Sequence, residues 1–203
     1  VRPIVGAVPQ LPPPARSGAS AASLRHAPRR SRPLPKLRDP GMLAADSLRR
    51  LQALHPKTIE LGLERLEVLL ARCGEPQRHL PPAIHIAGTN GKGSTLAMLF
   101  AGLKAAHRVV HAYTSPHLVT FHERIVVRNQ RIDDSSLAAL LHEIEAANGG
   151  EAITFFEATT CAAMLAFARS PADYTLLEVG MGGRLDATNP CGLAPTLCIL
   201  TPM

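Results

Sequence analysis

A chain of 203 residues with 46% apolar and only 3% aromatic residues can bury one sizeable core, which must be largely aliphatic because tryptophan is absent. The sequence contains no run of 18 apolar residues that could span a membrane. Its four cysteines include no Cys-x-x-Cys pair, which argues against a zinc site or a disulfide framework and favours a reducing, cytoplasmic setting. The net charge of +6 does not indicate nucleic-acid binding, because residues 1–40 carry seven Arg, one Lys and one Asp, which leaves the remainder slightly acidic.

The first 43 residues are predicted to form a disordered extension. They contain nine of the eighteen prolines and no aromatic residue, a composition that cannot build a core. An arginine-rich, acid-poor leader is also typical of organelle transit peptides, although prolines would interrupt the amphipathic helix that such a peptide needs. Residues 44–203 are then expected to form the folded part.

Two helices are predicted before the first strand. Asp46 and Ser47 suit the start of a short helix that runs through Leu54. A clearer helix is expected over 58–73, with Gly74 as its C-terminal cap. Its apolar residues recur at helical spacing: Ile59, Leu63, Leu66 and Leu70.

A strand, a glycine-rich turn and a helix then follow one another. The apolar run 83–87 predicts a buried strand, and Leu96 begins the helical pattern. The turn between them offers backbone N–H groups, a helix N-terminus and one lysine to the phosphates of a nucleotide such as ATP. Its residues are Gly88, Thr89, Asn90, Gly91, Lys92, Gly93, Ser94 and Thr95.

Individual side chains of this turn suit phosphate chemistry. Lys92 can reach the outer phosphates as a point charge, and Ser94 or Thr95 offers a hydroxyl to a phosphate or to Mg²⁺. The match to the common phosphate loop is imperfect, because Gly93 stands where Ser or Thr is expected. An ordinary glycine-rich turn from strand to helix therefore stays open as the alternative.

Candidate ligand-binding residues also follow the next strand. The run 108–113 predicts a second strand, parallel to the first through a right-handed crossover. Ser115 and Pro116 come directly after it, at the sheet edge where α/β folds place ligands. Ser115 is therefore a candidate Mg²⁺ ligand, or an ordinary turn serine. Arg124 is a candidate for contacting an anionic group, or simply a solvated charge.

A short strand at 125–127 and a turn at 129–130 come next. A helix is expected to begin at a cap formed by Asp133 or Asp134 and to end at Gly149. Its apolar face comprises Leu137, Leu140, Leu141 and Ile144. Only a packing role is implied for this helix.

The last predicted elements complete an alternation of helices and strands. Thr154 and Glu157 form a capping box for a helix. The run 174–179 predicts a third core strand, and 196–201 predicts a fourth. Glu178 is costly to bury at the end of an apolar strand unless it is paired or binds a metal such as Mg²⁺. The alternation predicts an α/β fold with a mostly parallel sheet.

Two separated stretches resemble one known family. The sequence Gly-Thr-Asn-Gly-Lys-Gly-Ser at 88–94 resembles the ATP loop of the Mur ligase superfamily. A glycine directly after the lysine resembles the loop in the folate branch of that superfamily, the dihydrofolate synthase/folylpolyglutamate synthase family. The run 176–189 resembles the second signature of that family and is more specific. The resemblance covers about residues 46–201. The resemblance implies that the chain forms the N-terminal part of a P-loop-containing, Mur-ligase-like ATPase domain. This domain would be truncated, and helices would flank its sheet.

The resemblance also implies site residues. Lys92 would be the catalytic cation, and Ser115, in a stretch similar to the omega loop of the family, would join Glu178 as a magnesium ligand. Three segments are similar to those that contact the pterin: Leu61, Gly62, Leu63 and Glu64; Thr154, Phe155, Phe156 and Glu157; and Leu185, Asp186 and Ala187. ATP and Mg²⁺ are the implied cofactors.

The implied activity is ATP-dependent ligation of L-glutamate to dihydropteroate, or glutamylation of folate, through an acyl phosphate. The expected partners are these small molecules, without nucleic acid or membrane, and the expected state is a monomer. The family's Asp-His segment, its carbamylated lysine and its C-terminal glutamate-ligase domain have no counterpart in these 203 residues. The isolated chain is therefore expected to be weak or inactive.

Three other interpretations stay open. One is another Mur-type amino-acid ligase that acts on a cell-wall nucleotide-peptide. The glycine after Lys92 and the run 176–189 argue against this interpretation. A second is a generic P-loop kinase or NTPase. A third is a truncated nucleotide-binding fragment without catalysis.

Overall fold

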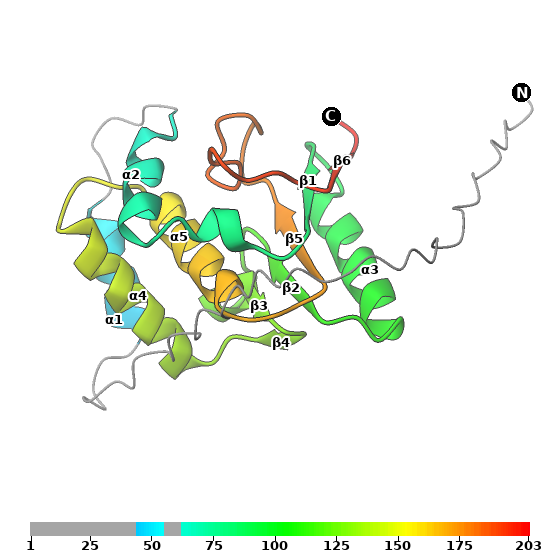
Figure 1. Cartoon of the computed structure of the whole chain (residues 1–203), viewed down its shortest axis with the longest axis horizontal. Helices are drawn as coiled ribbons and strands as arrows, with labels where there is room; N and C mark the ends of the chain where they lie inside the picture. The colour runs from blue at the N-terminus through cyan, green and yellow to red at the C-terminus, as the bar shows by residue number, and fades with distance from the viewer. Residues whose placement is uncertain (1–43, 55–61) are drawn as a thin grey trace, which may run out of the picture. The chain divides into compact units, whose positions relative to one another are not determined.

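Six strands form one sheet, in the order β4-β3-β2-β5-β1-β6 (Figure 1). This computed structural model describes residues 44–54 and 62–203, so the predicted extension 1–43 and the first residues of the helix predicted over 58–73 lie outside the described part. The strands are Ala83–Ala87 (β1), Val110–Tyr113 (β2), Ile125–Val127 (β3), Gln130–Arg131 (β4), Tyr174–Glu178 (β5) and Leu197–Leu200 (β6). The sheet is mostly parallel, as predicted, because β2, β5, β1 and β6 pair in parallel, and β3 alone runs in the opposite direction, antiparallel to both β2 and β4.

Helices cover the two faces of the sheet unequally. They are Ala44–Ala53 (α1), Glu64–Arg72 (α2), Lys92–Ala105 (α3), Asp134–Asn148 (α4) and Phe155–Ala168 (α5). In Figure 1, α3 lies on one side of the sheet and α1, α2, α4 and α5 lie on the other. Because the strands are covered on both faces, nearly all residues of β1, β2 and β5 are buried.

The sheet separates two apolar clusters. The larger cluster joins α1, α2, α4 and α5 to one face, with Leu51, Leu140 and Phe167 fully buried. The smaller one lies under α3 and includes Ile86 and Leu176. Both clusters are mainly aliphatic, as the composition predicts, and none of the described helices is long and apolar enough to cross a membrane.

Local capping signals in the sequence correctly predict the starts of α4 and α5. Asp133 is the N-cap of α4 and accepts a hydrogen bond from the backbone N–H of Ser136 at 2.8 Å. Gly149 ends the helix at a φ of 64°, as predicted. Thr154 and Glu157 form the predicted capping box at the start of α5.

Replacement of the Asp133 cap should destabilise the chain in a pH-dependent way. Hydrogen bonds from Ser135 and Ser136 lower the pKa of Asp133 from 3.8 to about 2. The cap therefore contributes its full stability above pH 3.8 and loses it as the pH falls toward 2. Asp133→Ala should cost about 1 kcal/mol of unfolding free energy at neutral pH, measured by urea denaturation.

The control for this prediction is Asp133→Asn, which keeps a capping oxygen without the charge. It should retain most of the stability at neutral pH and lose the dependence on pH between 2 and 4. Equal losses in Asp133→Ala and Asp133→Asn at neutral pH would contradict the cap as the cause.

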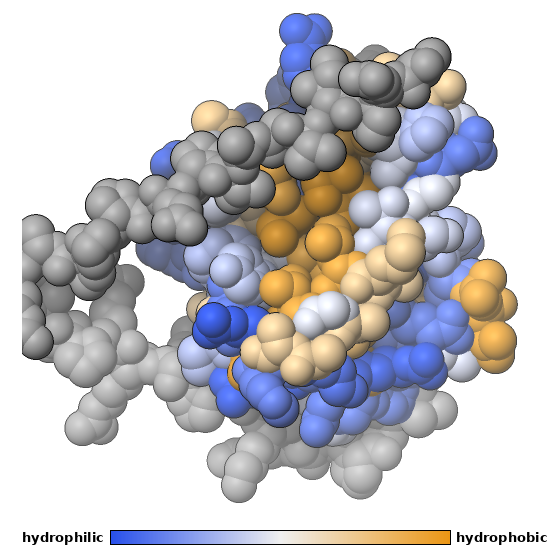
Figure 2. Space-filling model, turned by 90° about the vertical axis from the view of Figure 1, so that its right-hand side faces the viewer, coloured by the Kyte–Doolittle hydropathy of each residue, from blue (hydrophilic) through white to orange (hydrophobic). Residues whose placement is uncertain are grey.

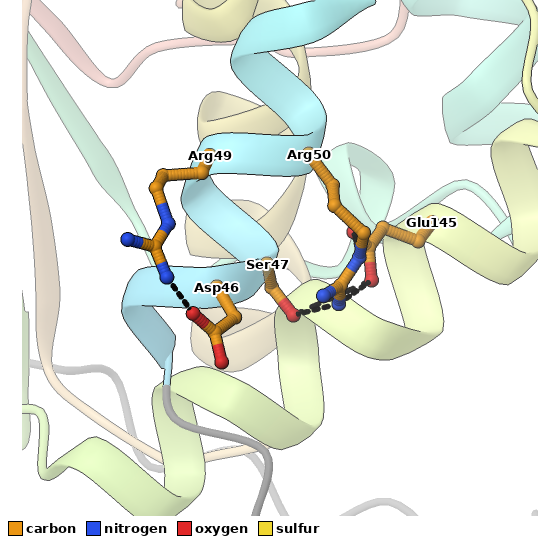
Figure 3. Close-up of polar contacts among 5 residues, drawn as sticks. All are labelled: Asp46, Ser47, Arg49, Arg50 and Glu145. Atoms are coloured by element: carbon orange, nitrogen blue, oxygen red, sulfur yellow. Dashed lines mark hydrogen bonds and ion pairs between the residues drawn. The ribbon is translucent and has the colours of Figure 1, made fainter.

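The prediction for the start of α1 was wrong. Asp46 and Ser47 lie inside the helix, where Ser47 is buried and its hydroxyl lies 3.3 Å from the Glu145 carboxylate of α4 (Figure 3). Arg50 donates two hydrogen bonds of 2.8 Å to the same carboxylate, and Asp46 pairs with Arg49. A contact with a distant helix therefore decides the position of Ser47, and local capping propensity does not.

Two other predicted boundaries are shifted. Helix α2 begins at Glu64, so Gly62 and Leu63 are not helical, which agrees with the low helix propensity of glycine. The β3–β4 turn runs through Arg128 and Asn129, with φ of 51° and 66°, and not through 129–130 as predicted. Gly74 follows α2 with a φ of 82°, as predicted for its cap.

The outer face of α3 is apolar and exposed. Of all residues in α3, only Leu96 is buried, although apolar residues surround the helix. Met98 on α3 is 67% exposed, and Leu200 on the neighbouring edge strand β6 is 73% exposed. Figure 2 faces this side of the molecule and shows apolar side chains gathered across its middle. An exposed apolar face of this kind is a candidate surface for association.

Candidate active site

The predicted phosphate loop joins the carboxyl end of β1 to the first turn of α3. Gly91 adopts a φ of 83° directly before the helix, a conformation that glycine tolerates best. The backbone N–H groups of Lys92, Gly93 and Ser94 precede the first hydrogen bond of the helix, from Thr95 N to Gly91 O. This arrangement gives an anion both unpaired donors and the positive end of a helix dipole.

The Lys92 ammonium folds back over this loop. Its Nζ donates to the carbonyl oxygen of Gly88 at 2.7 Å and to that of Thr89 at 3.4 Å. The N–H groups of Thr89 and Asn90 point elsewhere, because both donate to the Pro202 carbonyl at 3.1 Å. Lys92 and the first turn of α3 are therefore the cationic and N–H donors that this loop would offer to a phosphate.

A buried carboxylate lies next to this loop. Glu178 ends β5, directly beside β1, and only 6% of its surface is exposed. One oxygen accepts a 3.1 Å hydrogen bond from the backbone N–H of Ser115, which follows β2. Burial raises the pKa of Glu178, and the Ser115 N–H and the Lys92 charge oppose that rise.

The surroundings of Glu178 fit a magnesium ion bound to a nucleotide. Mg²⁺ usually takes one or two protein ligands, waters and substrate phosphates, so one carboxylate and the Ser115 hydroxyl beside a phosphate loop suffice. Among the described residues, no cluster of three His, Cys, Asp or Glu side chains forms a site that the protein would complete alone. Ser115 and Glu178 lie next to each other, and their role as magnesium ligands stays a prediction.

The glycine that departs from the common phosphate loop adjoins this carboxylate. A Cβ atom added to Gly93 would lie 3.6 Å from Glu178 Oε1, which is ordinary contact. Gly93 therefore adjoins Glu178 with no side chain of its own beside the carboxylate.

The first glycine of the loop should tolerate no side chain. A Cβ atom at Gly88 would lie 2.1 Å from Thr201 Oγ1 and 2.6 Å from the Thr201 carbonyl oxygen, and φ is 134°. Gly88→Ala should therefore lower the free energy of unfolding by about 2–4 kcal/mol in urea denaturation. Gly102→Ala is the matched control, because Gly102 lies exposed within α3 with nothing near its Cβ position. That control should stabilise the chain by about 0.5–1 kcal/mol.

A pocket of about 380 Å³ opens beside Ser115. Seven residues of the predicted pterin segments line it: Gly62, Thr154, Phe156, Glu157, Leu185, Asp186 and Ala187. Ser115 and Pro116 line it as well, so this pocket adjoins the Glu178 carboxylate through Ser115. The segments that meet here are far apart in the sequence and converge only in the fold.

Hydrogen bonds to Asp186 fix one wall of the pocket. Its carboxylate accepts from the Met181 N–H at 2.7 Å and from the Thr188 hydroxyl at 2.6 Å. The same Thr188 hydroxyl lies 2.7 Å from Nε2 of buried His85 on β1. These contacts fix the glycine-rich loop against the strand that enters the phosphate loop, so the two sites share one rigid support.

A second part of the pocket lining comes from the first turn of α5. The Glu157 carboxylate accepts from the Thr154 N–H at 2.8 Å and pairs with Arg65 of α2 at 3.3 Å. The Phe156 ring packs against Gly180, where an added Cβ would lie 2.5 Å from its Cζ. An aromatic ring, apolar side chains and held carboxylates suit a flat heterocycle with polar edges.

Some predicted contact residues lie outside the pocket lining. Leu63 and Phe155 pack against the larger core, and Glu64 is in the first turn of α2. Leu61 lies outside the described residues. Sequence reasoning missed Arg65, Pro116, Gly180 and Met181 as lining residues, although each lies in or directly beside a stretch that suggested the family.

Comparison with known proteins finds relatives that share one name. The chain is 46% identical over 139 residues to the dihydrofolate synthase/folylpolyglutamate synthase of Escherichia coli K12, covering 68% of this chain and 33% of that protein. It is 41% identical over 162 residues to the protein of the same name from Mycobacterium tuberculosis, covering 73% of this chain and 33% of the relative. The chain thus spans about a third of the length of these relatives. A scan against family profiles finds no match.

Solved structures show the same relationship. The complex of E. coli FolC with DHPP and ADP superposes with a TM-score of 0.73 at 42% identity, over 79% of this chain and 38% of the other. The Yersinia pestis folylpolyglutamate synthase/dihydrofolate synthase with AMPPNP and manganese gives a TM-score of 0.71 at 37% identity, over 78% of this chain and 38% of that one. The sheet, the phosphate loop and the pocket therefore belong to a fold that binds nucleotide and divalent metal in these relatives.

Proposed function

Since this chain belongs to the dihydrofolate synthase/folylpolyglutamate synthase family over the third of the relatives' length that it spans, we propose that it contributes the ATP and pterin sites of a glutamate ligase. The proposed activity is ATP-dependent ligation of L-glutamate to dihydropteroate, glutamylation of folate, or both. ATP and Mg²⁺ are the proposed cofactors, with Lys92, Ser115 and Glu178 in the roles that the family resemblance implies.

The observation that carries this proposal is the position of Ser115. Its N–H group donates to Glu178 at the phosphate loop, while the residue itself lines the apolar pocket. A substrate whose ring occupies the pocket would therefore place its far end next to the γ-phosphate of a nucleotide in the loop. Adjacent sites for an acid and for ATP are what the formation of an acyl phosphate requires.

The proposed chemistry has two steps. A substrate carboxylate attacks the γ-phosphorus of ATP and releases ADP, and the resulting acyl phosphate is attacked by the amino group of glutamate, which releases phosphate. The chain's own contribution is electrostatic, because Lys92 and the N–H groups of α3 stabilise charge on the transferring phosphoryl group. A bound Mg²⁺ ion would neutralise phosphate charge during the first step.

Trapping the acyl phosphate tests this proposal. The chain is incubated with ATP, Mg²⁺, dihydropteroate and hydroxylamine, which converts an acyl phosphate into a hydroxamate. Slow hydroxamate formation that requires dihydropteroate is the expected result, since the isolated chain is expected to be weakly active. Phosphate release that is equal with and without dihydropteroate would instead indicate a generic NTPase, and activity only with a nucleotide-peptide would indicate another Mur-type ligase.

A second candidate function is nucleotide binding without catalysis. The two N–H groups of Thr89 and Asn90 are already paired with Pro202, which leaves the loop fewer free donors for phosphate. Saturable binding of an ATP analogue without any hydroxamate would favour this function over the ligase.

The proposal also includes a domain assignment, an oligomeric state and a location. We assign residues 44–203 to part of an ATP-binding domain, without nucleic-acid partners, in a cytoplasmic monomer. Sedimentation velocity tests the monomer directly, because the exposed apolar face of α3 and β6 is the surface along which copies would associate.

A further inference from the structure

Arg124 differs from the other charged residues that line the pocket. The pocket lining contains two arginines, Arg65 and Arg124, and two carboxylates, Glu157 and Asp186. Arg65 pairs with Glu157, and Asp186 accepts hydrogen bonds from Met181 and Thr188. Within the described residues, no carboxylate lies within ion-pair distance of Arg124. The pocket therefore carries one guanidinium whose charge the chain does not neutralise by direct pairing.

Neighbouring rings hold this side chain in place. Its Nε donates to Nδ1 of His117 at 2.9 Å, and its guanidinium carbon lies 5.4 Å from the centre of the Phe121 ring. Phe121 packs edge-on against Phe155, at 5.7 Å between ring centres. Because Nε is already used, the two terminal nitrogens remain as a fork that suits a planar carboxylate.

Arg124 lies in the pocket that would hold the reacting end of the substrate. Arg124 and Ser115 line the same pocket, and Ser115 also contacts Glu178 beside the phosphate loop. Phe156 and Leu185 also line the pocket, and their apolar side chains suit the ring system. An anionic group on the substrate would meet its only unneutralised cation in the pocket lining at Arg124.

We infer that Arg124 is a specificity-determining residue that binds the carboxylate of the pterin substrate before that carboxylate is phosphorylated. The inference rests on the proposed function, and it goes further by naming the residue that distinguishes an acid from a neutral pterin. His117 and Phe121 act as positioning residues for the guanidinium.

The test compares two ligands on the full chain. Pteroate carries the benzoate carboxylate, and its analogue with hydrogen in place of that carboxylate keeps the same rings. Fluorescence titration should show that the wild-type chain binds pteroate about tenfold more tightly, the discrimination expected from a charged pair in a partly exposed pocket. In Arg124→Gln this preference should disappear through weaker pteroate binding, while affinity for the neutral analogue stays unchanged.

Two further variants separate charge from structure. Arg131→Gln is the matched control, because it removes an exposed arginine from β4, outside the pocket lining, and should keep the preference. Arg124→Lys should keep part of the preference, since it retains the charge without the planar fork. If Arg124→Gln fails to fold, Arg124→Lys takes its place, and an undiminished preference in that variant would overturn the role of the Arg124 fork.

The possible failures are distinguishable. Equal binding of both ligands by the wild-type chain would overturn the role of Arg124 and leave the pterin pocket standing. Equal weakening of both ligands in Arg124→Gln would show a structural role and would also overturn it. Binding of neither ligand by the wild-type chain would overturn the proposed pterin pocket itself, together with the inference.

Discussion

Lys92→Ala should weaken the binding of an ATP analogue by about 100-fold, a loss typical of the truncation of one partner of a close charge pair. Lys92 is the cation of the phosphate loop, and its ammonium lies 2.7 Å from the Gly88 carbonyl oxygen. The side chain is therefore already folded over the position of the phosphates. Isothermal titration calorimetry with a non-hydrolysable ATP analogue and Mg²⁺ measures the change.

The matched control for this prediction is Lys104→Ala. Lys104 is an exposed lysine in the last turn of the same helix, far along α3 from the loop. It should leave affinity unchanged within about twofold, since an exposed charge at that distance is screened. A comparable loss in both variants would show that nucleotide binding depends on general charge and not on the loop.

Local signals in the sequence predicted the elements that carry the site. The phosphate loop, the α4 cap at Asp133 and the α5 capping box at Thr154 depend on residues within a few positions of one another. Such contacts are set by the sequence itself, so pattern reasoning finds them. The position of Glu178 at a buried strand end was predictable for the same reason.

Contacts between distant segments were not predictable in this way. Ser47 was expected to cap a helix, but its side chain lies beside Glu145, 98 residues further along the chain. Phe155 and Phe156 were both assigned to the pterin site, yet successive helical residues point in different directions. Both rings pack against the larger apolar cluster, and Phe156 alone of the two also lines the pocket.

The pocket itself illustrates how far the sequence alone can lead. Family resemblance named most of its lining, because the resembling segments contain those residues. Arg124 was recognised only as a charge that either contacts an anion or faces solvent. Its place in the pocket follows from the packing of His117 and Phe121, which no pattern in the sequence specifies.

Glu178→Gln should abolish most of the effect of Mg²⁺ on nucleotide binding and also stabilise the metal-free chain. The substitution keeps the shape of the side chain but removes the charge beside the phosphate loop. Loss of this ligand should lower the affinity for Mg²⁺ by about 100-fold or more. Even the residues that only hydrogen-bond to metal ligands typically change metal affinity by about 10- to 100-fold when they are replaced. Titrating Mg²⁺ at a fixed concentration of the ATP analogue measures this loss.

The stability effect of the same variant has the opposite sign, and pH separates the two. Burial raises the pKa of Glu178 above its ordinary value of 4.5, so ionisation is less favourable in the folded chain than in the unfolded one. Below pH 4.5 Glu178 is protonated in both the folded and the unfolded chain, so its burial does not lower the stability of the wild type. The stability falls as the pH rises from 4.5 through the raised pKa, because the folded chain must then ionise the buried carboxyl. In EDTA, Glu178→Gln should therefore have a higher Tm than the wild type at pH 7 and about the same Tm at pH 4. A lower Tm at pH 7 would show that the Ser115 hydrogen bond outweighs the cost of burial, and unchanged Mg²⁺ dependence would remove Glu178 from the metal site.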